Sequence, residues 1–270
     1  MKTLVFYKYQ GTGNDFIVID NRFTKFVFSS QEIAFLCNRK YGIGADGLML
    51  YENVEDYDFK MVYYNADGQE GSMCGNGGRC LVAFAAFRNP YKKRFTFLAV
   101  DGEHVADIIV TDEKDKDIVS LQMKDVEVAS ITNDSYFTLN TGSPHLIQLV
   151  ASKTELQNID VDSAGKAIRY NEVYKKDGIN VNFAALISDN TLQMRTYERG
   201  VEAETESCGT GAVAVAIAAH YTQIVTTNEI TIHTQGGELT VHFQLENGVY
   251  KNVYLQGEVK KVFQGSILLG

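Results

Sequence analysis

The hydrophobic pattern of this chain is dominated by short strands and by two apolar helices. β-Branched and aromatic residues in partial alternation predict strands at 47–52, 59–64, 179–187 and 192–197. Two Ala-rich runs, 78–87 and 212–219, predict helices that are apolar on nearly every side. Helices of this kind must be buried. The pattern therefore predicts a strongly bent sheet wrapped around each helix.

The chain also carries an internal repeat whose period is about half its length. Cys74-Gly75-Asn76-Gly77 precedes one Ala-rich run, and Cys208-Gly209-Thr210-Gly211 precedes the other. In each half a predicted strand and a polar, Gly-containing loop lead to the cysteine. A weaker match, 9–18 to 140–147, occurs in the same order. The repeat predicts a duplicated fold with a boundary near residue 127.

Charge and composition exclude several classes of protein. The net charge of −9 argues against a nucleic-acid partner, which requires a basic face. No apolar run is long enough to span a membrane, and we expect no signal peptide. No two of the four cysteines form a Cys-x-x-Cys pair, and no histidine lies at zinc-binding spacing from them. We therefore expect a cytoplasmic protein with reduced thiols, no metal and no membrane partner.

Each Cys-Gly-x-Gly unit predicts an anion site with an activated thiol. The glycines allow close approach of a ligand, and the first turn of the following helix presents N–H groups that suit a carboxylate. The positive end of the helix also favours the thiolate. If the two units face one substrate carbon, one thiolate can remove the α-proton while the other thiol returns a proton on the opposite face. This arrangement inverts the configuration of an amino acid without a cofactor.

The remaining cysteines and one glycine-rich motif receive simpler interpretations. Cys37 and Cys80 are expected to be small core residues, because isolated cysteines usually are. The segment 42–47 fits the dinucleotide-binding pattern G-x-G-x-x-G. A predicted helix at 31–39 precedes it and a strand follows it, which is the reverse of the order that a nucleotide site needs. We interpret this segment as a tight turn.

The cysteine motifs resemble those of the diaminopimelate epimerase family. The run 65–68 followed by 74–80 is similar to the first active-site motif of that family, and 197–200 followed by 204–205 and 208–211 is similar to the second. Further similar segments, 11–20, 42–48, 142–145 and 180–183, occur in the expected order, so the resemblance covers nearly the whole chain. Two positions depart from the family pattern, Ser143 for a usual Asn and Gly47 for a Gln of some members.

The resemblance implies an α+β fold with two pseudo-symmetric halves, each a mostly antiparallel, barrel-like sheet around a central helix. The halves would comprise residues 1–127 with 258–270, and residues 128–257, with the active site in the cleft between them. The last strand, near 259–269, would return to the first half. The resemblance further implies a homodimer that uses neither pyridoxal phosphate nor a metal.

The same resemblance implies a reaction and a set of site residues. The reaction is the interconversion of LL- and meso-diaminopimelate, which serves lysine and peptidoglycan synthesis. Cys74 and Cys208 would be the catalytic thiols, assisted by Glu198 and His145. The implied substrate-binding residues are Asn14, Asn65, Gly75, Asn76, Asn180, Arg199, Gly209 and Thr210.

Three other interpretations remain open at this point. A proline racemase-like or hydroxyproline epimerase-like enzyme would also use two cysteines, but it would need a small apolar pocket where Asn180 and Arg199 suit a second amino-acid head group. A binding protein without turnover would not need two thiols at helix starts. A thiol redox protein is disfavoured by the wide separation of the cysteines along the chain.

Overall fold

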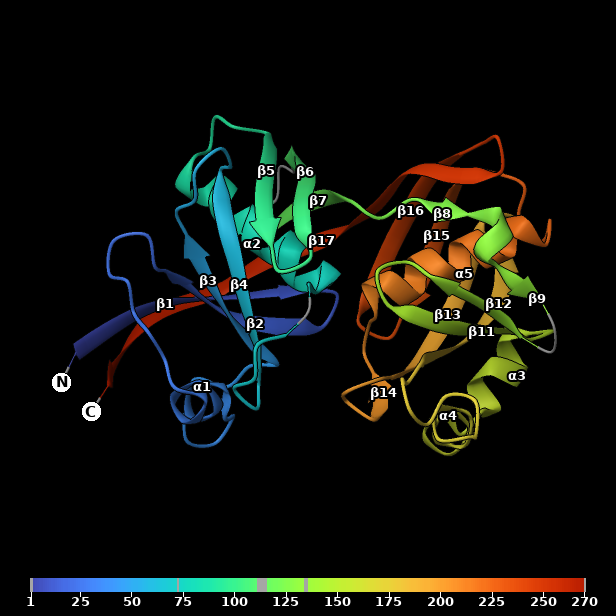
Figure 1. Ribbon diagram of the computed structural model, residues 1–270, viewed down its shortest axis with the longest axis horizontal. Coiled ribbons are helices and arrows are strands. Elements are labelled where there is room, and N and C mark those ends of the chain that lie inside the picture. The colour runs from blue at the N-terminus through green and yellow to red at the C-terminus, as the bar shows by residue number, and fades with distance from the viewer. Residues whose placement is uncertain (1, 72, 111–115, 134–135, 270) are drawn as a thin grey trace. The chain divides into compact units, whose positions relative to one another are not determined.

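The computed structural model describes residues 2–71, 73–110, 116–133 and 136–269, and the chain divides into two compact units (Figure 1). Unit 1 comprises residues 1–121 and 257–270, and unit 2 comprises residues 122–256. Each unit combines a mostly antiparallel sheet with one long buried helix. The predicted α+β fold class is confirmed.

Unit 1 begins with a strand hairpin and places its long helix between the fourth and fifth strands. Its elements are β1 (Lys2–Gly11), β2 (Asn14–Asp20), α1 (Ser30–Cys37), β3 (Gly47–Glu52), β4 (Phe59–Asn65), α2 (Gly75–Arg88), β5 (Arg94–Ala99), β6 (Gly102–Val110), β7 (Lys116–Gln122) and the C-terminal part of β17 (Val249–Leu269). The strand predictions at 47–52 and 59–64 are confirmed by β3 and β4.

Within the described residues, eight strands of unit 1 close into a barrel. The order is β1, β2, β3, β4, β5, β6, β7 and β17, and β17 pairs again with β1. The pairs β2–β3 and β4–β5 are parallel, and the other pairs of the ring are antiparallel. Helix α2 is buried from Gly75 to Ala85 and packs against β1, β2, β3, β4 and β6 (Figure 1). The sheet thus wraps its helix as the pattern predicted.

Unit 2 repeats this arrangement. Its elements are β8 (Val126–Glu127), a 3-10 turn (Val128–Ser130), β9 (Thr132–Asn133), β10 (Phe137–Asn140), β11 (Pro144–Leu149), α3 (Lys153–Asn158), α4 (Val161–Arg169), β12 (Asn180–Ser188), β13 (Thr191–Glu198), β14 (Ala203–Thr205), α5 (Gly209–Tyr221), β15 (Glu229–Thr234), β16 (Gly237–Glu246) and the first part of β17. The pairs β10–β11, β12–β13 and β15–β16 are antiparallel, whereas β11–β12 and β13–β15 are parallel. This is the pairing sequence of β1 to β6.

Helix α5 forms the centre of the unit 2 core. Its residues from Ala212 to Ala219 have no exposed surface, and strands β10, β11, β12, β13, β15 and β16 contact it. No polar face interrupts this stretch, so burial on all sides is the arrangement that removes the most apolar surface from water. Both long helices begin directly after the motif cysteines, as predicted, and the glycines of the two motifs form their first turns.

Strand β17 begins ten residues before the predicted 259–269. It follows Asn247 and Gly248, which both have positive φ (51° and 77°), as in the two-residue type I′ turns of β-hairpins. Its first residues pair with β8 in unit 2, and its last residues pair with β7 and β1 in unit 1. The exposed Asn252, whose φ is 49°, interrupts the hydrophobic alternation that would have revealed the first part of this strand.

The simpler interpretations of Cys37, Cys80 and segment 42–47 are confirmed. Both thiols are buried, and burial raises the pKa of Cys37 to about 12 and also raises that of Cys80. Helix α1 precedes segment 42–47 and β3 follows it, while Gly44 adopts a φ of +83° that an L side chain rarely adopts. This segment is a turn rather than a nucleotide-binding loop.

Candidate active site

Cys74 is the N-cap residue of α2. Its Sγ accepts a hydrogen bond from the Gly77 N–H at 3.5 Å, and the side chain is half-buried. The first-turn N–H groups of a helix have no partners within the helix. The start of α2 therefore combines a thiol with N–H donors and the positive end of the helix dipole, which together favour a thiolate and a bound carboxylate.

Asn14 orients a hydrogen-bond acceptor toward Cys74. Its Nδ2 donates to Asp46 Oδ2 at 2.7 Å, which leaves Oδ1 on the other side of the amide. Asn14 Oδ1 lies 3.7 Å from Cys74 Sγ and 3.5 Å from Asn76 Nδ2. The S–H form of Cys74 can donate to this oxygen, while the Gly77 N–H stabilises the thiolate form. The site therefore suits both protonation states that an acid/base group must visit.

The start of β2, which carries Asn14, is held by a network of charges. Asp15 pairs with Lys8 at 2.8 Å and with Arg39 at 2.7 Å, and Arg39 also reaches Asp46. Burial raises the pKa of Asp15, but the hydrogen bonds and charges of Arg39 and Lys8 outweigh burial and lower it to about 2. This network fixes Asp46 and, through it, the orientation of Asn14.

Arg79 is a buried cation in the first half of α2. Within the described residues its partners are neutral, namely Asn76 Oδ1 at 2.7 Å, Thr12 Oγ1 at 3.2 Å and the Glu258 backbone oxygen at 3.5 Å, and its Nε has no acceptor. Burial lowers the pKa of Arg79 to about 10, and the electrostatic interactions with Cys80 and Cys74 oppose this shift. A buried charge is costly unless an opposite charge lies near it. The thiolate form of Cys74 would supply such a charge.

Cys208 is the N-cap residue of α5 and is buried. Its Sγ lies 3.6 Å from Thr210 Oγ1, which in turn lies 2.9 Å from His145 Nε2. The hydroxyl of Thr141 donates to the Thr210 backbone oxygen at 2.8 Å and ties the β10–β11 loop to the first turn of α5. The structure therefore brings together three predicted site residues, Cys208, Thr210 and His145.

His145 is fully enclosed in unit 2. It has no exposed surface, and Asn182 Nδ2 lies 3.1 Å from its Nδ1. Burial first and the charge of Arg199 second lower the pKa of His145 to about 3. The imidazole is therefore neutral at neutral pH, and both of its nitrogens are hydrogen-bonded within the protein.

A second group of predicted residues lies beside His145, at the start of β12 and the end of β13. Asn180, the parallel-register partner of His145, donates through Nδ2 to Ser143 Oγ at 2.9 Å and accepts from the Arg199 backbone N–H at 2.9 Å. Arg199 Nη2 donates to Ser143 Oγ at 3.3 Å. Ser143, which departs from the family pattern, thus connects two predicted substrate-binding side chains.

Glu198 and Asn65 lie at the ends of corresponding strands, β13 and β4. Glu198 Oε2 accepts a hydrogen bond from Thr205 Oγ1 at 2.8 Å, while the Asn65 side chain is exposed. Gly47, the other departure from the family pattern, leaves no room for a side chain, because a Cβ there would lie 2.5 Å from the Tyr63 ring. This chain therefore cannot place a glutamine at 47 without moving Tyr63.

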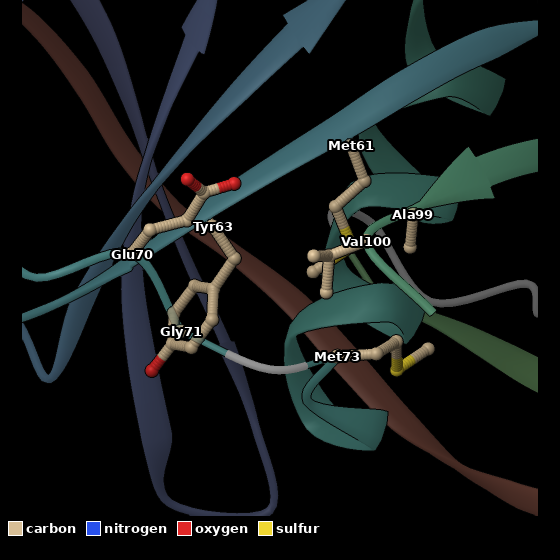
Figure 2. A pocket seen from close by; sticks show the side chains of 7 residues that line it. All are labelled: Met61, Tyr63, Glu70, Gly71, Met73, Ala99 and Val100. Carbon is tan, nitrogen blue, oxygen red and sulfur yellow. The ribbon is translucent and has the colours of Figure 1, made fainter. Parts of the chain in front are cut away.

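A small hollow lies beside the loop that leads to Cys74. Figure 2 shows Tyr63 and Glu70 on one side of it and Met61, Ala99 and Val100 on the other. Gly71 and Met73 complete its lining, so none of the predicted site residues lines it. We therefore place no substrate group in this hollow.

Sequence reasoning missed three residues that support the site: Asp46, Arg79 and Asn182. All three lie inside segments that match the family, but the sequence pattern does not single them out because their roles depend on contacts with distant residues. An arginine within an otherwise apolar helix was the available signal for Arg79. Across the described residues, no cluster of three or more metal-ligating side chains is present. No described helix is long and apolar enough to cross a membrane.

Comparison with known proteins identifies the family. The family model described as diaminopimelate epimerase matches residues 6–128 and 137–262. The curated diaminopimelate epimerase of Flavobacterium psychrophilum is 52% identical over 264 residues, which is 97% of this chain and 99% of that protein. The chain belongs to the diaminopimelate epimerase family. A second member, from Chlorobaculum tepidum, is 41% identical and covers 96% of this chain and 99% of its own length.

Membership in the diaminopimelate epimerase family makes the chain an isomerase, as predicted. Solved structures with low sequence identity share the fold. A phenazine biosynthesis protein of the PhzF family from Bacillus anthracis has a TM-score of 0.72 at 15% identity and covers all of both chains. A probable proline racemase from Agrobacterium radiobacter has a TM-score of 0.70 at 14% identity, with 99% of this chain and 93% of that chain covered.

Proposed function

We propose that this chain interconverts LL- and meso-diaminopimelate, with Cys74 and Cys208 as its acid/base pair. One observation carries the proposal: each cysteine is the N-cap of a buried helix whose first turn is Gly-x-Gly. The family membership and the 52% identical curated relative support the substrate. Both thiols lie at helix N-termini, where the helix dipole favours a thiolate, whereas Cys37 ends α1 and Cys80 lies within α2.

The proposed reaction proceeds through a carbanion at the α-carbon. One thiolate removes the α-proton, and the electron pair of the C–H bond moves toward the carboxylate. The other thiol then delivers its proton to the opposite face, so that the two sulfurs have exchanged protonation states when the product forms. The N–H groups at the helix starts, from Gly75, Asn76, Gly209 and Thr210, stabilise the negative charge that develops on the carboxylate.

The distal part of the substrate requires polar and charged partners. Asn180 and Arg199 lie together with Ser143 at one end of the unit 2 sheet, and we assign them to the distal amino-acid group. Arginine suits this role because its planar guanidinium pairs with a carboxylate through two hydrogen bonds. Asn14 and Asn65 are assigned to further polar groups of the substrate, and Glu198 to its ammonium group.

The first experiment is exchange in deuterated water. Purified protein with reductant is incubated with LL-diaminopimelate, with proline in a parallel sample, and NMR follows α-deuterium and the meso product. Deuterium and meso product from diaminopimelate alone support both the reaction and the substrate. Exchange in proline alone would retain the two-thiol chemistry but reject the substrate, and exchange in neither would reject the proposal.

The mechanism requires both thiols to reach one α-carbon, and this requirement has its own test. Two thiols that can approach each other this closely can form a disulfide on oxidation. We expect mild oxidation to give a Cys74–Cys208 crosslink in the mass spectrum, with loss of activity that a reductant restores. Full activity of the crosslinked protein would contradict the two-thiol mechanism.

We further propose a homodimer in the cytoplasm. The reducing cytoplasm keeps both thiols in the form that proton transfer needs, and the family resemblance carries the dimer. Sedimentation equilibrium of the purified chain of 30.1 kDa should give twice that mass. A monomer at micromolar concentration with full activity would reject the dimer and leave the reaction unaffected.

A further inference from the structure

A chain of hydrogen bonds leads from the interior of unit 2 to the sulfur of Cys208. Asn182, which has no exposed surface, places Nδ2 3.0 Å from the Leu146 backbone oxygen and 3.1 Å from His145 Nδ1. His145 Nε2 lies 2.9 Å from Thr210 Oγ1, and that hydroxyl lies 3.6 Å from Cys208 Sγ. The proposed chemistry assigns no role to Asn182.

The direction of these hydrogen bonds is set by the backbone. A carbonyl oxygen only accepts, so the Asn182 atom that faces Leu146 is the NH2 group. The same NH2 group donates to His145 Nδ1, which must therefore lack a proton. A neutral imidazole then carries its proton on Nε2 and donates it to Thr210 Oγ1. The Thr196 hydroxyl, 3.0 Å from Asn182 Oδ1, completes this arrangement.

The tautomer of His145 determines what Thr210 can offer to Cys208. When Nε2 carries the proton, Thr210 accepts from His145 and its own hydroxyl proton remains for the sulfur. In the other tautomer, Nε2 would accept a hydrogen bond from the Thr210 hydroxyl. Thr210 would then offer Cys208 only a lone pair. A hydrogen bond that is donated to the charged form of a group favours that form. Only the Nε2–H tautomer therefore stabilises a thiolate at Cys208 through Thr210.

We propose that Asn182 is a positioning residue that holds His145 in the Nε2–H tautomer, so that Thr210 donates a hydrogen bond to the thiolate of Cys208. His145 then acts through Thr210 and exchanges no proton with the substrate. The close packing of α5 on β12 supports this role, because a Cβ at Gly211 would lie 2.5 Å from Asn182 Oδ1. The use of this thiolate as a base rests on the proposed function, but the hydrogen-bond chain does not.

The tautomer can be observed directly in the unmodified protein. The chain has five histidines, and 15N NMR of histidine-labelled protein, with His145→Gln for assignment, reports which nitrogen carries the proton. We expect the Nε2–H tautomer, with no titration between pH 5 and 8. An Nδ1–H tautomer, or a protonation midpoint within that range, would overturn the proposal.

Alkylation of Cys208 tests the last link of this hydrogen-bond chain, from Thr210 to the sulfur. In a Cys74→Ser background, iodoacetamide labelling of the Cys208 peptide is measured by mass spectrometry at pH 7. We expect labelling about tenfold slower in Thr210→Val and about threefold slower in Asn182→Ala, because the thiolate loses a donated hydrogen bond or the orientation of its donor. Thr210→Ser should retain the original rate.

The control for alkylation is Asn190→Ala, which makes the same substitution in the β12–β13 turn, away from His145. It should label at the original rate. Equal rates in Thr210→Val and Thr210→Ser would reject the role of the hydroxyl, with circular dichroism confirming that each variant is folded. Neither the tautomer nor the labelling rate requires turnover. A chain that failed to epimerise diaminopimelate could therefore still pass both tests, and an active epimerase could fail them.

Discussion

The two cysteine sites share a backbone design but surround their sulfurs with different groups. At the start of α2 the support comes from the helix itself, where Asn76 is followed one turn later by the buried guanidinium of Arg79. At the start of α5 the equivalent position is Val213, and the support comes from the surrounding sheet through His145 and Asn182. One site uses a full positive charge, and the other uses a chain of neutral dipoles.

This difference shows that a repeated motif need not carry a repeated electrostatic environment. The N-cap position and the Gly-x-Gly turn are local properties, so both halves retain them. The side chains that pack under each turn are buried in a different core, and any polar group among them must find hydrogen-bond partners in that core. A buried arginine needs several hydrogen-bond acceptors, which Thr12, Asn76 and the β17 backbone provide in unit 1. A core of alanine and valine provides none, so the polar support in unit 2 enters from β11 and β12.

The variants with the largest expected effect test whether both cysteines are needed for the reaction despite this difference. Cys74→Ser and Cys208→Ser should each lower kcat/KM by about 10³-fold, because each removes one partner of a general acid/base pair. The meso product formed from LL-diaminopimelate measures the loss, with thermal unfolding as the control for folding. A large loss in one variant with near-normal activity in the other would contradict a two-thiol mechanism.

The second prediction isolates the charge of Arg79. Arg79→Met should slow the alkylation of Cys74 at pH 7 by about tenfold, because a nearby cation favours the thiolate. The alkylation of Cys208 in the same sample serves as an internal control and should not change. Arg79→Lys, which keeps a positive charge, should retain more of the Cys74 rate than Arg79→Met. Equal slowing at both cysteines would indicate a general loss of structure instead.

The third prediction concerns the neutral histidine of unit 2. Burial and the Arg199 charge lower the pKa of His145 from 6.5 to about 3 on folding, so the unfolded chain binds a proton at a higher pH than the folded chain. The contribution of His145 to stability is therefore complete above pH 6.5. It falls by about 1.4 kcal/mol per pH unit as the pH is lowered from 6.5 toward 3.

Urea unfolding between pH 7.5 and 4.5 measures this dependence. The His145→Gln variant should show a shallower loss of unfolding free energy than the original chain, because glutamine does not titrate. Asn190→Ala, which replaces a side chain that does not titrate in the β12–β13 turn, is the control and should leave the slope unchanged. Identical slopes in the original chain and in His145→Gln would show that His145 does not enter the core neutral.

The smallest effect is expected at Ser143, where this chain departs from its family. Ser143→Ala removes a hydroxyl that accepts from both Asn180 and Arg199. We expect KM for diaminopimelate to rise about threefold with kcat nearly unchanged, because the loss of one hydrogen bond to a charged or amide donor loosens the distal binding residues. Steady-state kinetics with LL-diaminopimelate measure both constants. A fall in kcat with unchanged KM would place Ser143 near the reacting carbon instead.

Local pattern accounts for much of what could be predicted about this protein. The two apolar helices, the cysteines at their starts and the strands β3, β4, β12 and β13 follow from spacing and residue type, because burial and helix capping act over a few residues. Helix α1 carries a capping box between Ser29 and Glu32 in the same way. The family was also identified from the sequence, since its motifs are long and contiguous.

Tertiary structure alone decided how each site is supported. The pairing of Arg79 with acceptors from the β1–β2 turn and β17, and the contact of Asn182 with His145, join residues far apart in the chain. No local rule predicts them, because a buried polar side chain takes whatever partner the folded backbone brings within hydrogen-bond distance. Residue type and spacing place the thiols on their helices, whereas the folded chain supplies the charges and dipoles that surround them.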